Sequence, residues 1–327
     1  MPPNFSDHTA LTKNTCVVAI GGANIDVLGR AFGPLAKADS TPGEVRLAPG
    51  GVARNVAENL ARLGVNAHLV SVVGADSFGE QLLRATQAAG VGVSAVSRVH
   101  EGRTGSYLSL HGPQGELACA INDMQLLDAL TPEALAAHWA LFCGASSLVM
   151  DCNLSADSLA CLLNGDLKAP IFVDAVSAAK CLRIKPWLPR IHTLKLNRLE
   201  AQTLLGWAPI EGGAQARIDW AQGAALALHD LGVSNVVLSL GAQGAAWCGV
   251  DGQCGHSAGR VLEVVNTTGA GDALLAGLVF AHLRQMPLAQ AVPWALRCAE
   301  ITLQSPTANA ANLSVEWVDR LHAGASF

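Results

Sequence analysis

Short apolar runs alternate with longer amphipathic segments along most of the chain. The run Cys16–Ile20 has the length of a buried strand, whereas Val52, Val56 and Leu60 mark one face of a helix. Such alternation is typical of a mostly parallel sheet that is covered by helices. The pattern predicts an α/β fold with strands over 16–20, 68–73, 93–99, 148–150, 171–173, 193–195 and 235–240, and helices over 52–63, 77–88, 214–231, 270–284, 288–303 and from 314 onward.

Two segments interrupt this alternation. Residues 27–49 contain several Gly and Pro residues and show little helical periodicity, and residues 104–122 contain the hairpin signal Gly112-Pro113-Gln114-Gly115. We expect roughly residues 27–49 and 100–122 to form a small sheet that covers the site as a lid. A lid would keep water from an activated phosphate.

The remaining sequence gives no sign of a domain boundary. It contains no repeat, no low-complexity segment and no obvious linker, so residues 1–327 are expected to form a single domain with the lid attached. Segments 245–250 and 260–264 flank the turn Asp251-Gly252 and are expected to form an antiparallel margin of the sheet.

Composition and charge argue against several classes of protein. The net charge is −5 and no Lys/Arg run occurs, so a nucleic-acid partner is not expected. No run of about 18 apolar residues is present, and residues 1–14 contain no apolar leader, so no membrane partner is expected. The nine Cys residues are odd in number and form no C-x-x-C pair, which favours free thiols in a reducing, cytoplasmic compartment.

Candidate chemistry is concentrated in residues 264–276. Val264 and Val265 are expected to end a strand, after which a small polar loop leads into a long apolar helix. Uncovered backbone N–H groups at such a helix start attract anions. The small residues at this start are Gly269, Ala270 and Gly271. Asp272 follows directly and could take a proton from a substrate hydroxyl, although a Gly-rich turn with a favourably placed Asp explains these residues equally well.

A second group of polar residues follows the first predicted strand. Asp26 lies beyond the carboxyl end of this strand, where ligands bind in open α/β sheets, although an Asp that only bonds its own loop is slightly favoured. Gly50-Gly51 allow close approach of backbone to a ligand, and Asn55 would face the same opening from the following helix. Neither G-x-G-x-x-G nor G-x-x-x-x-G-K-[ST] occurs, which disfavours a nicotinamide-dependent dehydrogenase and excludes a P-loop kinase.

Asn197 and Glu200 are three residues apart at a predicted helix start. An amide and a carboxylate in this arrangement could hold Mg²⁺ or its waters. They could equally form a capping box, which the spacing alone favours.

Taken together, these motifs resemble those of the ribokinase-like family of carbohydrate and nucleoside kinases, over nearly the whole chain. The resemblance rests on Gly50-Gly51-Val52-Ala53-Arg54-Asn55, on Asn266-Thr267-Thr268-Gly269-Ala270-Gly271-Asp272 and on the Asn-x-x-Glu between them. Within the family, segments 120–124, 173–180, 191–200 and 264–266 are most similar to the members that phosphorylate the nucleoside pseudouridine.

The resemblance implies a ribokinase-like fold with a β-sheet lid and a role for each motif. Asp272 would be the general base toward a ribose 5′-hydroxyl, beside an anion hole at 269–271. The implied substrate ligands are Asp26, Gly50, Gly51 and Asn55, with Asn24 and Asn153 as weaker candidates. The implied ATP-site residues are Asn197, Ser239, Gly241, Gly244, Thr268 and Asn309, the last near the adenine. Asn197 and Glu200 would organise Mg²⁺ and phosphate through water.

Two positions depart from the family pattern. Leu196 replaces a frequent Pro, and Asn266 replaces the Asp of many relatives that monovalent cations activate, so no potassium dependence is inferred. The expected partners are ATP and a small nucleoside or sugar, with a homodimer formed through the lid. The alternatives are a kinase of the same fold that acts on ribose, adenosine or another nucleoside, and a catalytically inactive nucleoside-binding protein.

Overall fold

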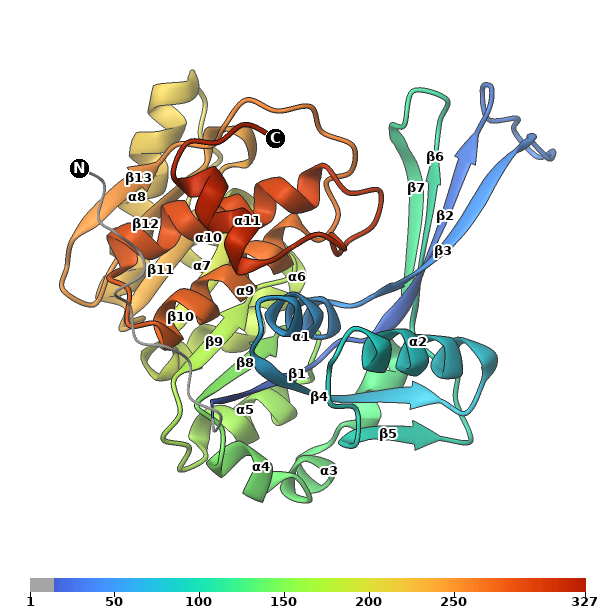
Figure 1. The fold of residues 1–327 in the computed structure, drawn as a ribbon, viewed down its shortest axis with the longest axis horizontal. Coiled ribbons are helices and arrows are strands. Elements are labelled where there is room, and N and C mark those ends of the chain that lie inside the picture. The colour runs from blue at the N-terminus through green and yellow to red at the C-terminus, as the bar shows by residue number, and fades with distance from the viewer. Residues whose placement is uncertain (1–14) are drawn as a thin grey trace.

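A nine-stranded sheet forms the centre of the molecule (Figure 1), in a computed structural model that describes residues 15–327. Segment 1–14, where no apolar leader was expected, lies outside the described residues. In spatial order the strands are β13 (Cys254–Ser257), β12 (Ala245–Cys248), β11 (Asn235–Ser239), β10 (Thr193–Asn197), β9 (Ile171–Asp174), β8 (Ser147–Asp151), β1 (Cys16–Ile20), β4 (Asn66–Gly74) and β5 (Val96–Val99). The pairs from β11 to β5 are parallel, and β12 and β13 form an antiparallel margin.

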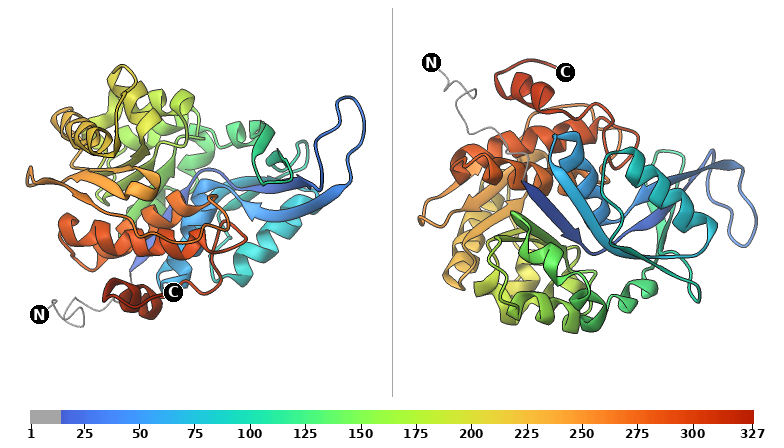
Figure 2. Two further views of the ribbon diagram at one scale, coloured as in Figure 1. Left: turned by 90° about the horizontal axis from the view of Figure 1, so that it is seen from above. Right: turned by 60° about the horizontal axis from the view of Figure 1, so that its bottom comes forward.

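Helices cover both faces of this sheet, as Figure 2 shows. One layer contains α1 (Val52–Arg62), α2 (Ser77–Ala88), α9 (Ala270–Leu283), α10 (Leu288–Leu303) and α11 (Val315–His322). The other contains α3 (Pro132–Ala136), α4 (Trp139–Cys143), α5 (Ala156–Asn164), α6 (Ala178–Cys181), α7 (Arg198–Leu205) and α8 (Ala214–Asp230). Because β8 and β9 are buried on both faces, they read as continuous apolar runs up to a terminal Asp.

A separate four-stranded sheet projects from the body of the molecule (Figure 1). Its strands, in spatial order, are β3 (Gly43–Gly50), β2 (Asn24–Ala31), β6 (Ser106–His111) and β7 (Leu117–Asp123). Paired residues share a face of a sheet. Asp26, Tyr107 and Asn122 are paired in register on one face, and Val27, Leu108 and Ile121 on the other, so the small sheet has two chemically different faces.

The predicted strands and helices are confirmed apart from shifts of a few residues at their ends and two corrections. The strand expected at 260–264 is wrong, because β12 pairs instead with β13, directly after the turn at Gly252. The strand end expected at Val264 and Val265 is also wrong. The amide N–H groups of Val265 and Asn266 donate to the carbonyl of Leu303 at the end of α10, which draws this segment out of the sheet.

The expectation of free thiols is wrong for one pair of cysteines. Cys248 and Cys254 are register partners in the β12–β13 hairpin and form a disulfide, with Cα atoms 4.0 Å apart. The other seven cysteines are free in the described chain, as expected. Within residues 15–327, no helix is both long and apolar enough to cross a membrane.

Candidate active site

The candidate site lies where the order of the parallel strands reverses. The chain continues from β1 to β4 on one side, and returns to pair β8 with β1 on the other. Ligands of open α/β sheets bind outside the carboxyl ends of the strands at such a switch point. A pocket of about 160 Å³ is found here. Its lining residues are Asn24, Asp26, Gly51, Val52, Asn55, Tyr107, Asn122, Met124, Asn153, Val176, Thr268 and Asp272.

Asp272 is held in the first turn of α9, only 8% exposed. The helix starts after Gly269, whose φ of 81° is left-handed, and a Cβ at this position would overlap the carbonyl oxygen of Ala308. Asn55 Nδ2 of α1 donates to Asp272 Oδ2 over 2.8 Å. The structure thus brings together the two motifs that are 217 residues apart in sequence.

Two charged residues, Lys195 and Asp174, lie close to Asp272, and sequence reasoning did not select either of them for the site. Lys195, in the middle of β10, donates from Nζ to Asp174 Oδ2 at the end of β9 over 2.9 Å. A Cβ at Gly271 would lie 2.5 Å from this Nζ, so the lysine sits directly beneath the helix start. Lys195 is the last residue of the predicted strand 193–195, and Asp174 directly follows the predicted strand 171–173. A polar residue at the carboxyl end of a strand is the signal that could have identified both.

Burial and repulsion from Asp174 raise the pKa of Asp272 to about 7, against the opposing effects of Lys195 and the Asn55 hydrogen bond. Burial alone would favour a neutral Lys195, but the charges of Asp174, Asp272 and Glu200 raise its pKa above the usual value. A carboxyl group with a pKa near neutrality, next to a fixed cation and a helix start, is suited to general base chemistry beside an anion.

Asp151 at the end of β8 explains the Gly21-Gly22 pair. Its Oδ2 accepts from the backbone N–H groups of Gly22 and Ala53, at 2.8 and 3.0 Å. A Cβ on Gly21 would lie 2.5 Å from the carboxyl carbon. The buried carboxylate therefore fixes the loop after β1 to the start of α1, and the glycines serve this approach rather than a dinucleotide.

Asp26 and its neighbours form the wall of the pocket on the side of the small sheet. Asn24 Nδ2 donates to Asp26 Oδ1 over 2.7 Å, and burial raises the pKa of Asp26 despite this bond. A Cβ on Gly50 would overlap the Asp26 carboxylate, and one on Gly51, where φ is 99°, would overlap the carbonyl of Gly22. The small sheet adds Tyr107 and Asn122, which sequence reasoning missed because their direction depends on strand register.

Asn153 lines the same pocket, and its Oδ1 accepts from Lys180 Nζ over 2.6 Å. Among the residues expected to bind ATP, Thr268 lines the pocket, whereas Ser239, Gly241 and Gly244 do not. These three lie at the end of β11 and in the turn that follows it. They share the carboxyl edge of the sheet with the pocket, and their role in nucleotide binding stays a prediction.

Asn309, which was expected near the adenine, lies in a buried polar network, and its role beside an adenine stays a prediction. Its side chain is 7% exposed, and Oδ1 accepts from Arg54 while Nδ2 donates to the Asn55 carbonyl and to Asn59 Oδ1. Its donors are committed within the molecule. The sequence could not show this, because the partners lie on α1, about 250 residues earlier.

Asn197 and Glu200 form the capping box that their spacing favoured. Asn197 Oδ1 accepts from the Glu200 N–H, and both carboxylate oxygens of Glu200 accept from Asn197. With Glu200 only 2% exposed, direct coordination of Mg²⁺ by its carboxylate does not fit. No group of three or more His, Cys, Asp or Glu side chains within residues 15–327 is placed to hold a metal. An indirect contribution through water stays a prediction.

The fold is a doubly wound sheet with a separate small sheet. A carboxylate at a helix start lies in the cleft between their elements. This combination defines the class of ribokinase-like sugar and nucleoside kinases. A model of the pfkB family carbohydrate kinases matches residues 14–314. The chain therefore belongs to the pfkB family of carbohydrate kinases.

Individual relatives agree with this assignment. The chain is 44% identical to a pseudouridine kinase of Escherichia coli (strain K12), over 91% of this chain and 94% of the relative. It is similar to the crystal structure of a putative sugar kinase from Clostridium perfringens, with a TM-score of 0.80 and 30% identity over 95% of this chain and 96% of the other. Arabidopsis thaliana ribokinase complexed with ribose and ATP shares the fold, with a TM-score of 0.79 and 20% identity over 95% and 99%.

Proposed function

We propose that this kinase transfers the γ-phosphoryl group of ATP to the ribose 5′-hydroxyl of pseudouridine, giving pseudouridine 5′-phosphate and ADP. The observation that carries the proposal is the buried carboxylate of Asp272, which lines the pocket at the start of α9 and is bonded to Asn55. The choice of nucleoside is supported by the 44% identical relative and by the pocket, whose lining includes several amide side chains.

In this mechanism Asp272 accepts the proton of the 5′-hydroxyl as its oxygen attacks the γ-phosphorus. The bond between that phosphorus and the bridging oxygen breaks, and the electron pair leaves with ADP. The uncovered N–H groups at 269–271 and the charge of Lys195 stabilise the transferring group. Mg²⁺, when bound with ATP, neutralises phosphate charge, and we assign no protein ligand to it.

Pseudouridine differs from uridine in its base, which presents two ring N–H groups because it is joined to ribose through carbon. We assign the base to the side of the pocket that Asn122, Asn153 and Tyr107 line, and the ribose to Asp26 and Asn55. Amide oxygens can accept the additional N–H donor. The small sheet would then act as a lid, since Tyr107 and Asn122 belong to it.

We also propose that two copies associate through the outer face of this lid. That face carries Val45, Leu47 and Ile121, which are 71%, 45% and 61% exposed, so it presents apolar side chains to solvent. A second copy would bury them.

The decisive experiment measures ADP release with Mg-ATP against pseudouridine, uridine, adenosine and ribose in parallel. The expected result is a kcat/KM for pseudouridine well above those for the other acceptors. A preference for another acceptor would discard the substrate and keep the kinase. No turnover with any of them, in a protein that still binds pseudouridine, would favour an inactive nucleoside-binding protein.

A further inference from the structure

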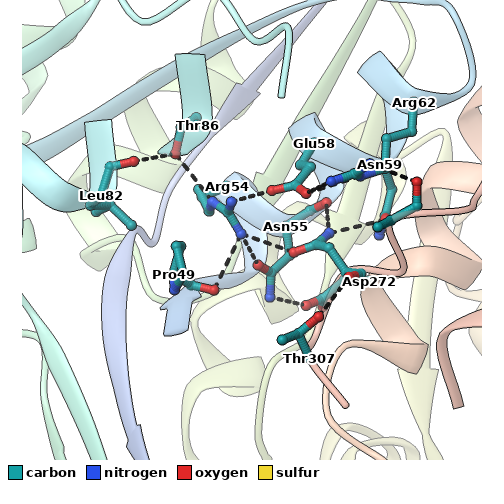
Figure 3. A network of polar contacts seen from close by, with 12 residues as sticks. Pro49, Arg54, Asn55, Glu58, Asn59, Arg62, Leu82, Thr86, Asp272 and Thr307 are labelled. Atoms are coloured by element: carbon teal, nitrogen blue, oxygen red, sulfur yellow. Dashed lines mark hydrogen bonds and ion pairs between the residues drawn. The ribbon is translucent and has the colours of Figure 1, made fainter. Parts of the chain in front are cut away.

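The guanidinium of Arg54 is buried in a polar network that reaches Asp272 through Asn55 (Figure 3). Arg54 is 3% exposed in the first turn of α1. It forms an ion pair with Glu58, and its Nη1 donates to Asn55 Oδ1 over 3.0 Å and to Asn309 Oδ1 over 2.9 Å. Its Nε donates to Thr86 Oγ1 over 3.2 Å. Burying a guanidinium is costly, and such a site is retained only where its bonds are well satisfied.

The hydrogen bond from Arg54 to Asn55 determines which way the Asn55 amide points. A carboxamide carries an acceptor on one side and two donors on the other, and arginine can only donate. Because Arg54 faces Asn55, the oxygen of that amide must point toward the arginine. The NH₂ group is thereby turned toward Asp272 and donates to Oδ2 over 2.8 Å. Without Arg54, the orientation of the amide depends on Asp272 itself, and a protonated Asp272 can donate to the amide oxygen instead.

The second contact reaches the loop behind the anion site. Asn309 Nδ2 donates to the carbonyl of Asn55, so the loop is bonded to α1 at two points. The carbonyl of the preceding residue, Ala308, lies against Gly269 at the start of α9. Arg54 therefore contacts both the group that holds Asp272 and the loop that supports the helix start.

We propose that Arg54 is a positioning residue that fixes the Asn55 amide, and through it orients the Asp272 carboxylate for proton transfer. This inference rests on the proposed function. Arg54 does not line the pocket itself, so it acts through Asn55. Because Asn55 is also assigned to the ribose, we expect kcat and the KM for the nucleoside to change, and the KM for ATP to stay the same.

The charged groups around Asp272 determine the direction of the expected effect. Asp174 on β9 and Asp151 on β8 raise the pKa of Asp272, while Lys195 on β10 and the Asn55 hydrogen bond lower it. Loss of Arg54 frees the Asn55 amide and also removes a nearby positive charge. Both changes raise the pKa of Asp272, so the acid limb of the rate profile must move to higher pH.

The test compares kcat and KM over pH for the wild type, Arg54→Met and the control Arg62→Gln. Arg62 shares Glu58 as a partner and donates to the carbonyl of Ala311 in the same loop, but no bond joins it to Asn55. We expect Arg54→Met to lower kcat at neutral pH by about tenfold or more and to shift its acid limb upward by about one pH unit, with the KM for ATP little changed. Arg62→Gln should leave the limb in place.

A double-mutant cycle separates orientation from simple charge. In an Asn55→Ala background, Arg54→Met should shift the acid limb far less than in the wild type, because there is no amide left to orient. An equal shift in both backgrounds, or no shift with native Asn55, would overturn the proposal. Glu58 keeps Arg62 as a partner when Arg54 is lost, which favours folding. If Arg54→Met still fails to fold, Arg54→Lys is the second variant. It keeps a positive charge beside Glu58 but lacks the planar guanidinium that donates to Asn55, so it should shift the acid limb of the pH profile in the same direction.

Failure of this inference is distinct from failure of the proposed function. If the wild type phosphorylates a nucleoside and Arg54→Met has the same pH profile of kcat, Arg54 has no role in the mechanism and the proposed kinase activity still stands. A wild type without turnover on the acceptor panel removes the function first.

Discussion

Asp272 accepts a proton only in its ionised form, and its pKa of about 7 places that change near neutral pH. We therefore predict that kcat/KM falls below about pH 7 and levels off above it. Asp272→Asn should lower kcat by roughly 10²–10⁴, the usual contribution of a general base, while ATP binding measured by calorimetry survives. Near-wild-type turnover in this variant would remove Asp272 from the role of base.

The Asp272 carboxyl should also lower the free energy of unfolding at alkaline pH. Its folded pKa of about 7 lies above the unfolded value of 3.8, so the folded state holds the proton more tightly. That stabilisation is complete below the unfolded pKa and is lost as pH rises through the folded pKa. Asp272→Asn does not titrate, and its midpoint of thermal unfolding should rise relative to the wild type between about pH 5 and about pH 8. A difference that is constant over this range would contradict the raised pKa.

Among elements, the start of α9 depends most on a single residue. Gly269→Ala places a Cβ against the carbonyl of Ala308 at a left-handed φ, so we expect a stability loss of about 1–3 kcal/mol or more and strongly reduced turnover. Gly223→Ala is the matched control. Gly223 lies within α8 with nothing near its Cβ position, and this change should add about 0.5–1 kcal/mol without altering kcat. Urea unfolding and steady-state kinetics measure both, and equal effects at the two sites would exclude a special role for the helix start.

At the scale of the whole molecule, the outer face of the lid is the surface proposed to hold two copies together. Ile121→Lys places a charge in this face and should convert a dimer into a monomer, as measured by light scattering after gel filtration. Val250→Lys, at a position 72% exposed beside the β12–β13 turn, is the control and should leave the mass unchanged. A wild type that is monomeric at working concentrations would refute the proposed interface.

The sequence by itself determined the elements of this protein and the residue types at its site. Apolar runs of strand length and helical stripes gave the α/β alternation, since local periodicity records which side of an element is buried. Gly269, Gly51 and Asp272 stood out because a helix start that leaves N–H groups uncovered requires small residues and gains from a nearby acid.

Only the tertiary structure decided how these residues meet. The pairing of Lys195 with Asp174 beneath Gly271 depends on the lateral order of the strands, which the local pattern does not encode. The hydrogen bond between Asn309 and Arg54 likewise depends on long-range packing, which the sequence did not show. The pKa of Asp272 also depends on the tertiary structure, since neighbours from four separate strands and helices together set it near neutrality.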